Sequence, residues 1–153
     1  MINILVLGLL AMVACLAFEV VTVALAVRYF SHVKVRPLGE RGYHSALIEM
    51  SVLMTLLMLG ILVQVMVWAA LYRVAGRFED IETAFYFSGV TFTSLGYGDV
   101  VLTGDLRLLA PLEAANGMMM FGISTAAFIT AIQQAIARHV ADRRDVDPPS
   151  PTA

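Results

Sequence analysis

Charged residues are scarce in this sequence, and cysteine is nearly absent. Asp, Glu, Lys and Arg make up 14% of the 153 residues, against about 25% in a typical soluble domain. A formal net charge of −2 predicts neither a nucleic acid nor another strongly charged partner. The single cysteine, Cys15, excludes an intramolecular disulfide. The motifs H-E-x-x-H, G-x-S-x-G and the P-loop are missing as well, so we expect no enzyme activity.

Apolar residues, by contrast, make up 59% of the chain. A membrane-spanning helix needs about 20 of them, and the runs that are long enough are 1–27, 50–72 and 108–137. Glu19 and Glu113 are the charged residues within these runs. The first run begins without Lys or Arg, which predicts a retained anchor rather than a signal peptide. A fourth uncharged run, 83–98, is too short to cross and suits a re-entrant segment.

The distribution of basic residues predicts the orientation of the spans. Segment 28–49 holds four Lys or Arg residues and segment 138–153 holds three, whereas in 73–107 three are outnumbered by acids. Because basic loops stay in the cytoplasm, we expect a multi-pass cell-membrane protein with its N-terminus outside and its C-terminus in the cytoplasm. Trp68 and Tyr72 suit the outer lipid interface.

The short run 83–98 carries the pattern most specific for a function. Acids at Glu79, Asp80 and Glu82 favour the start of a helix, which we expect over 82–93. Gly96 and Gly98 then alternate with a tyrosine. Glycine adopts positive φ without a steric clash, and alternating left- and right-handed residues point successive carbonyls the same way. Rings of such carbonyls can replace the hydration shell of a cation; the alternative is a glycine turn in a membrane loop.

The residues Thr93-Ser94-Leu95-Gly96-Tyr97-Gly98-Asp99 resemble the T-x-G-Y-G-D filter signature of the tetrameric potassium channel pore domain. The resemblance extends over 46–137, with an outer helix at 46–73, a pore helix at 82–93, a filter at 94–98 and an inner helix at 107–137. It implies an all-α membrane protein with three transmembrane helices, a re-entrant pore helix and a filter loop, assembled as a fourfold tetramer. Outside this unit we expect an extra transmembrane helix at 1–28, a cytoplasmic basic loop at 29–45 and a short disordered tail at 138–153.

The resemblance also implies roles for individual residues. The residues expected to coordinate the ion are Ser94, Leu95, Gly96, Tyr97 and Gly98. Those expected to support the filter are Thr93, Asp99, Tyr86 and Phe87. The ring of Tyr97 would pack against Tyr86 and Phe87. Ser94 stands where the family usually has threonine, so it keeps the oxygen but lacks the methyl group that stiffens χ1. Val90 stands where some members of the family carry a glutamate, so a carboxyl–carboxylate link to Asp99 cannot form from this position.

The inner helix contains two glycines and a row of small or polar residues. Gly122 resembles the hinge of similar channels, although Gly117 and Gly122 could equally serve close helix packing. Residues spaced three and four apart share one helix face, and this predicts a cavity lining of Ile123, Ala126, Thr130 and Gln134. A hydrogen bond between helices is the alternative for that face. Glu19 either has a function or is protonated and bonded to Thr22 or Thr55.

Together these patterns predict a channel that conducts K⁺ passively through a carbonyl-lined filter. The permeant ion is K⁺, and we expect no cofactor. The expected partners are further copies of the chain, K⁺ and membrane lipid. Two alternatives remain open from the sequence: a weakly selective cation channel of the same architecture, and a non-conducting membrane scaffold or accessory subunit.

Overall fold

The computed structural model describes residues 2–32 and 43–146. In order along the chain, the helices are α1 (Ile2–His32), α2 (Tyr43–Val74), α3 (Ile81–Phe92), the 3-10 helix η1 (Gly104–Leu108) and α4 (Leu109–Val146). Three segments are long and apolar enough to cross a membrane: Ile2–Arg28, Leu47–Val74 and Gly104–Gln134. The prediction of three spans in an all-helical chain is therefore confirmed for the described residues.

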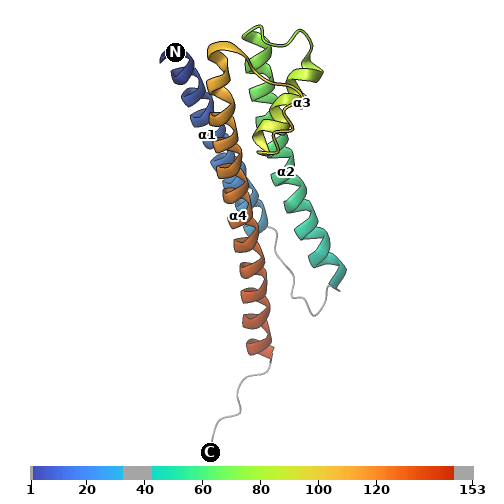
Figure 1. The fold of residues 1–153 in the computed structure, drawn as a ribbon. Coiled ribbons are helices and arrows are strands. Elements are labelled where there is room, and N and C mark those ends of the chain that lie inside the picture. Colours follow the sequence, from blue (N-terminus) through green and yellow to red (C-terminus); the bar gives the residue numbers. More distant parts are fainter. Residues whose placement is uncertain (1, 33–42, 147–153) are drawn as a thin grey trace, which may run out of the picture.

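The three long helices run side by side, and the short α3 lies beside them near one end of the bundle (Figure 1). Figure 1 shows α3 at the same end as the start of α1, while α4 runs on to the opposite end. The short α3 contacts both α2 and α4, and α1 also contacts both of these helices. The chain thus forms a three-helix bundle in which one short helix doubles back from α2 before α4 begins.

The core of the bundle lies between α1, α2, α3 and α4. Trp68 and Tyr72 are fully buried there, together with Cys15 of α1 and Met120 of α4. The prediction that Trp68 and Tyr72 lie at the lipid interface is therefore wrong, because neighbouring helices cover both side chains. Many large apolar side chains point outward instead, as expected of helices that face lipid.

Two expected boundaries also need correction. Helix α4 continues past residue 137 to Val146, so the disordered tail predicted from residue 138 is wrong for 138–146. The helix ends two residues before Pro148, and a proline disfavours helix at the residue before it. Helix α1 extends to His32 and α2 begins at Tyr43, which makes both ends of the expected 29–45 loop helical. The expected features at 33–42 and 147–153 lie outside the described residues.

Candidate functional site

The site begins with the helix α3, which has a well-formed cap at each end. Asp80 is the N-cap, and its carboxyl accepts hydrogen bonds from Thr83 N at 2.6 Å and Thr83 Oγ1 at 2.9 Å. The bond from the Thr83 backbone N–H lowers the pKa of Asp80, because it stabilises the ionised carboxylate. The helix begins at Ile81, one residue earlier than expected, and Asp80 of the predicted acidic start is its N-cap.

At its other end α3 passes directly into the predicted filter. Ser94 N donates to the carbonyl of Thr91 and Leu95 N donates to the carbonyl of Val90, both at 2.9 Å. This pair of bonds is the Schellman motif, which requires a left-handed residue after the C-cap. Ser94 fills that position with φ 58°. One residue therefore ends the helix and begins the segment that follows.

Residues with positive φ then alternate with residues with negative φ. The positive φ angles are 58° at Ser94, 57° at Gly96 and 80° at Gly98, whereas Leu95 and Tyr97 have negative φ. This is the backbone alternation that the glycine spacing predicts. All five residues are exposed on the single chain, and a Cβ at Gly96 or Gly98 would meet nothing within 4 Å. Segment 94–98 therefore has an unusual backbone and little cover from its own chain.

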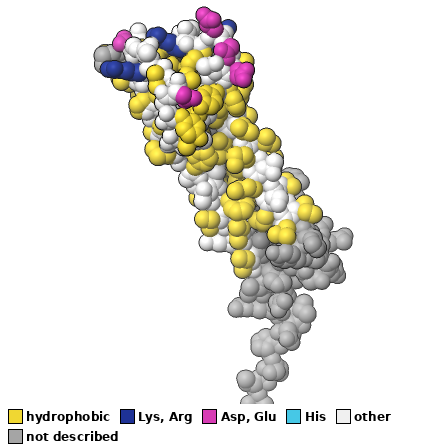
Figure 2. All heavy atoms as spheres, turned by 45° about the vertical axis from the view of Figure 1, so that its right-hand side comes forward, with side chains coloured by type: hydrophobic (Ala, Val, Ile, Leu, Met, Phe, Trp, Pro, Cys, Tyr) yellow, Lys and Arg dark blue, Asp and Glu magenta, His cyan; other side chains and the backbone are white. Residues whose placement is uncertain are grey.

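Tyr86 links α3 to the far end of this segment. Its hydroxyl donates to Asp99 Oδ2 at 2.6 Å. This bond lowers the pKa of the Asp99 carboxyl, so the group stays ionised over a wider pH range. Figure 2 shows the charged side chains gathered at this end of the molecule, above a largely hydrophobic face. The Tyr86 hydroxyl thus holds the negatively charged Asp99 carboxylate in place at this site. The aliphatic side chain of Val90 cannot make such a bond.

The other two predicted supporting residues have different surroundings. Phe87 is buried and packs edge-on against Tyr72, with ring centroids 5.2 Å apart. Tyr97 remains 68% exposed. The expected packing of Phe87 and Tyr86 around the Tyr97 ring is thus not made within one chain. Thr93 bonds to its own helix, donating from Oγ1 to the carbonyl of Gly89 at 2.7 Å.

Behind α3 lies a buried carboxyl group that the sequence reasoning did not use. Glu113 of α4 is fully buried, and Tyr72 OH donates to its Oε2 at 2.6 Å. Ser88 Oγ lies 2.5 Å from Glu113 Oε1 and 2.8 Å from the carbonyl of Val65. A hydroxyl has one proton to donate, so both Ser88 contacts are satisfied when Glu113 itself carries a proton. This network ties α3 to α2 and α4, and the lone acid in an apolar run was the signal for it.

A second buried carboxyl lies deeper in the bundle. Glu19 of α1 accepts a hydrogen bond from Gln64 Nε2 at 2.8 Å and one from Ser124 Oγ at 2.5 Å. The expected partners are therefore wrong: Thr22 and Thr55 donate to carbonyls four residues earlier in their own helices. Their hydroxyls are satisfied locally, which leaves Glu19 to bond across the helix interfaces.

The two glycines of α4 have opposite surroundings. A Cβ at Gly117 would lie 1.9 Å from the carbonyl oxygen of Phe92, whereas one at Gly122 would meet nothing within 4 Å. Close packing therefore explains Gly117, and the hinge assigned to Gly122 stays a prediction.

The predicted cavity-lining face of α4 is mostly open on the single chain. Ala126, Thr130 and Gln134 are exposed, and Ile123 is half-buried against the core. Thr130 and Gln134 also border a narrow crevice toward α1 and α2, beside Ala26. The lining role of these residues stays a prediction.

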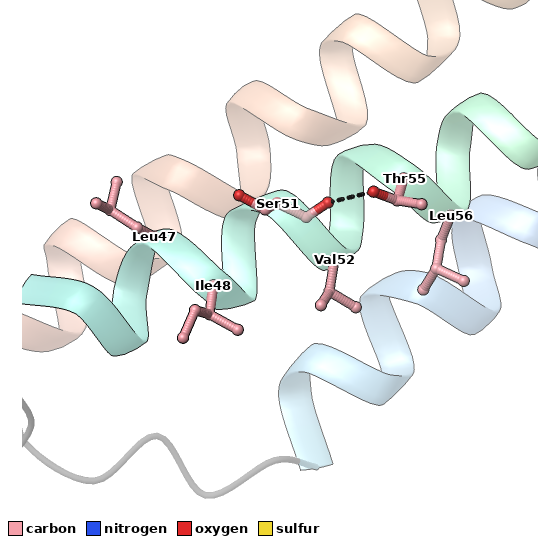
Figure 3. Close-up of a pocket in the computed structure, with 6 residues that line it drawn as sticks. All are labelled: Leu47, Ile48, Ser51, Val52, Thr55 and Leu56. Carbon is pink, nitrogen blue, oxygen red and sulfur yellow. Dashed lines mark hydrogen bonds between the residues drawn. The ribbon is translucent and has the colours of Figure 1, made fainter.

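A separate hollow is lined by no titratable side chain. It is a groove of about 350 Å³ on the early turns of α2, and Figure 3 shows its lining residues on successive turns of that one helix. Its two hydroxyl residues are linked within the helix, since Thr55 Oγ1 donates to the carbonyl of Ser51 at 2.8 Å. The remaining lining is aliphatic, which suits contact with lipid rather than a reaction site.

A sequence model of the family described as "Ion channel" matches residues 50–134, which is 85 of the 153 residues. The chain belongs to this ion channel family. The matched part of the channel protein contains most of α2, all of α3 and α4 as far as Gln134, and it leaves α1 outside. No curated protein and no solved structure gave a match. Family membership and the three candidate spans indicate a multi-pass membrane protein that transports ions rather than an enzyme.

Proposed function

We propose that this ion channel is selective for K⁺ and that the backbone of Ser94–Gly98 forms its filter. The observation that carries the proposal is the alternation of positive and negative φ through these residues. Such a backbone aims successive carbonyl oxygens in one direction, and carbonyl oxygens can replace the water around a dehydrated cation. Ser94, Leu95, Gly96 and Tyr97 supply these oxygens, and Gly98 and Asp99 complete the outer mouth.

The same geometry requires several copies of the chain. One strand cannot surround an ion, and the filter segment is exposed on the single chain. We propose a homotetramer in which the segments meet on a common axis, with α3 as the re-entrant pore helix. Ile123, Ala126, Thr130 and Gln134 then line a water-filled cavity below the filter, and Gly122 provides the hinge. The acidic end that carries α3 faces outward, and α4 ends in the cytoplasm.

Ion flux from liposomes that contain only the purified protein tests the proposal. We expect rapid flux of K⁺ and Rb⁺, slow flux of Na⁺, and block by Ba²⁺. Comparable K⁺ and Na⁺ flux would leave a weakly selective cation channel. Absence of flux, together with no tetramer after chemical crosslinking, would leave a scaffold or accessory subunit.

Two glycines provide a matched pair for the filter itself. Gly96 (φ 57°) and Gly76 (φ 69°) both adopt the left-handed region, and a Cβ at either would meet nothing within 4 Å. Alanine at each position therefore carries the same backbone cost, about 1–2 kcal/mol. We expect Gly96→Ala to abolish K⁺ selectivity or flux and Gly76→Ala to retain both. Equal effects would contradict a filter at Gly96.

A further inference from the structure

Glu19 joins the first helix to the two helices beside it. Its side chain is fully buried in the span of α1. One carboxyl oxygen accepts a hydrogen bond from Gln64 of α2 and the other from Ser124 of α4. A carboxyl within a membrane span is costly, and residues of this kind are usually functional. The cost is offset here by bonds that cross between helices, so the carboxyl fixes their relative positions.

Ser124 is buried, but it lies beside open space on α4. It follows Gly122 by two residues, and the space around Gly122 is open. On the α2 side of Ser124 there is a hollow of about 140 Å³ between α2 and α4, bordered by Met58, Phe121 and Phe128. A polar bond therefore holds α4 on the α1 side, and the packing is loose on the α2 side.

The bond responds to small movements of α4. A hydrogen bond is lost beyond about 3.5 Å, so a shift of Ser124 by about 1 Å away from Glu19 breaks it. Further along the bundle, the contacts among Ala26, Leu57 and Phe128 are apolar, and apolar contacts are not directional. A bond made in one arrangement and lost in another shifts the balance between the two.

We propose that Glu19 is a positioning residue that holds α4 at Ser124 and thereby sets the balance between open and closed channels. The inference rests on the proposed channel function and extends it to α1, which lies outside the family match. Helix α1 is then a gating element of each subunit as well as a membrane anchor.

Single-channel recording of the purified full-length protein in planar bilayers tests this role. Glu19→Leu and Ser124→Ala each remove the bond, and we expect both to shift the ratio of open to closed time in the same direction. The expected shift is about 5- to 150-fold, the range usual for coupled sites. The double variant should shift no further than the larger single effect, because both changes remove one interaction.

Glu19→Gln should restore behaviour to within about twofold of the unmodified channel, because the amide keeps an acceptor for Gln64 and a donor for Ser124. Thr22→Val is the control on the same helix, since the Thr22 hydroxyl donates to the carbonyl of Phe18 in α1 itself. We expect it to leave the ratio unchanged. Reversal potentials in mixed K⁺ and Na⁺ should be the same in all variants.

A purely structural role would lower the thermal stability of Glu19→Leu and Ser124→Ala while the assembled channels kept the unmodified ratio, and this would overturn the proposal. Glu19→Gln behaving like Glu19→Leu would overturn it as well. If Glu19→Leu fails to assemble, Ser124→Ala decides, since it removes only one oxygen. Absence of current in the unmodified protein would instead refute the channel function itself.

Discussion

Substitution of Gly117 by alanine tests whether a contact between α4 and α3 holds the proposed filter in place. A Cβ at Gly117 would lie 1.9 Å from the carbonyl oxygen of Phe92, and real Cβ atoms essentially never approach another atom closer than 3.0 Å. The two backbones must therefore separate by at least 1.1 Å (3.0 − 1.9). Phe92 is the last residue of α3, and the first proposed K⁺ ligand, Ser94, follows two residues later. The displacement therefore reaches the filter.

Gly122→Ala is the matched control, because the added Cβ there meets nothing within 4 Å. Both changes bring the same gain in helix propensity, about 1 kcal/mol. Overpacking costs about 1–3 kcal/mol, so the Gly117→Ala assembly should be less stable than the Gly122→Ala assembly by about this amount. Selectivity should fall in the first variant alone, since ion coordination depends on the placement of the carbonyls.

Thermal unfolding in detergent gives the stability difference, and reversal potentials in mixed K⁺ and Na⁺ give the selectivity. Both measurements use the same preparations of the two variants. Equal stability and equal selectivity would refute the reasoning, because they would show that α4 does not touch the end of α3 as closely as described.

Substitutions at four residues test other parts of the protein. Tyr86→Phe removes the hydrogen bond that lowers the pKa of Asp99, so the Asp99 pKa should rise toward its ordinary value of about 4. As the pH is lowered, single-channel conductance should then begin to drop at a higher pH than in the unmodified protein. Identical conductance titrations of the two proteins would contradict this. Glu113→Gln should keep the thermal unfolding temperature near its original value, since the amide can still donate and accept. Glu113→Ala should cost about 1–3 kcal/mol for the unpaired Tyr72 hydroxyl, because Ser88 still donates to the carbonyl of Val65. Ser94→Thr should change open probability or ion preference, because a β-branched residue is strained at φ 58°, and Gln134→Ala should change conductance only modestly. The opposite result for this last pair, seen in single-channel records, would place the gate near Gln134 on α4 rather than at the proposed filter.

The spans and the helix α3 could be predicted from sequence because they depend on local patterns. Long apolar runs with at most one charge each set the spans, and Asp80 marks the start of α3 within one residue. The alternation at Gly96 and Gly98 followed from the freedom of glycine to take positive φ. The left-handed Ser94 was not predicted, because it results from the two hydrogen bonds that close α3, and a serine gives no sign of such a conformation.

The partners of buried polar groups could not be predicted. Glu19 bonds to Gln64 and Ser124, which lie 45 and 105 residues further along the chain. Such pairings depend on how the helices are rotated against one another, and several rotations bury similar apolar area. The same uncertainty explains the error at Trp68: an aromatic residue near a span end suits the lipid interface, and only the packing of α1 shows that it is covered.

The bond between Glu19 and Ser124 also bears on the order in which the chain assembles in the membrane. Ser124 is made 105 residues after Glu19, which at roughly 5–20 residues per second of synthesis is a delay of about 5–20 s. During this delay α1 holds a carboxyl whose second partner does not yet exist. Helix α1 thus completes its contacts only when α4 is made, and a chain truncated before α4 keeps an acid inside the bilayer with the bond to Gln64 but without the bond to Ser124.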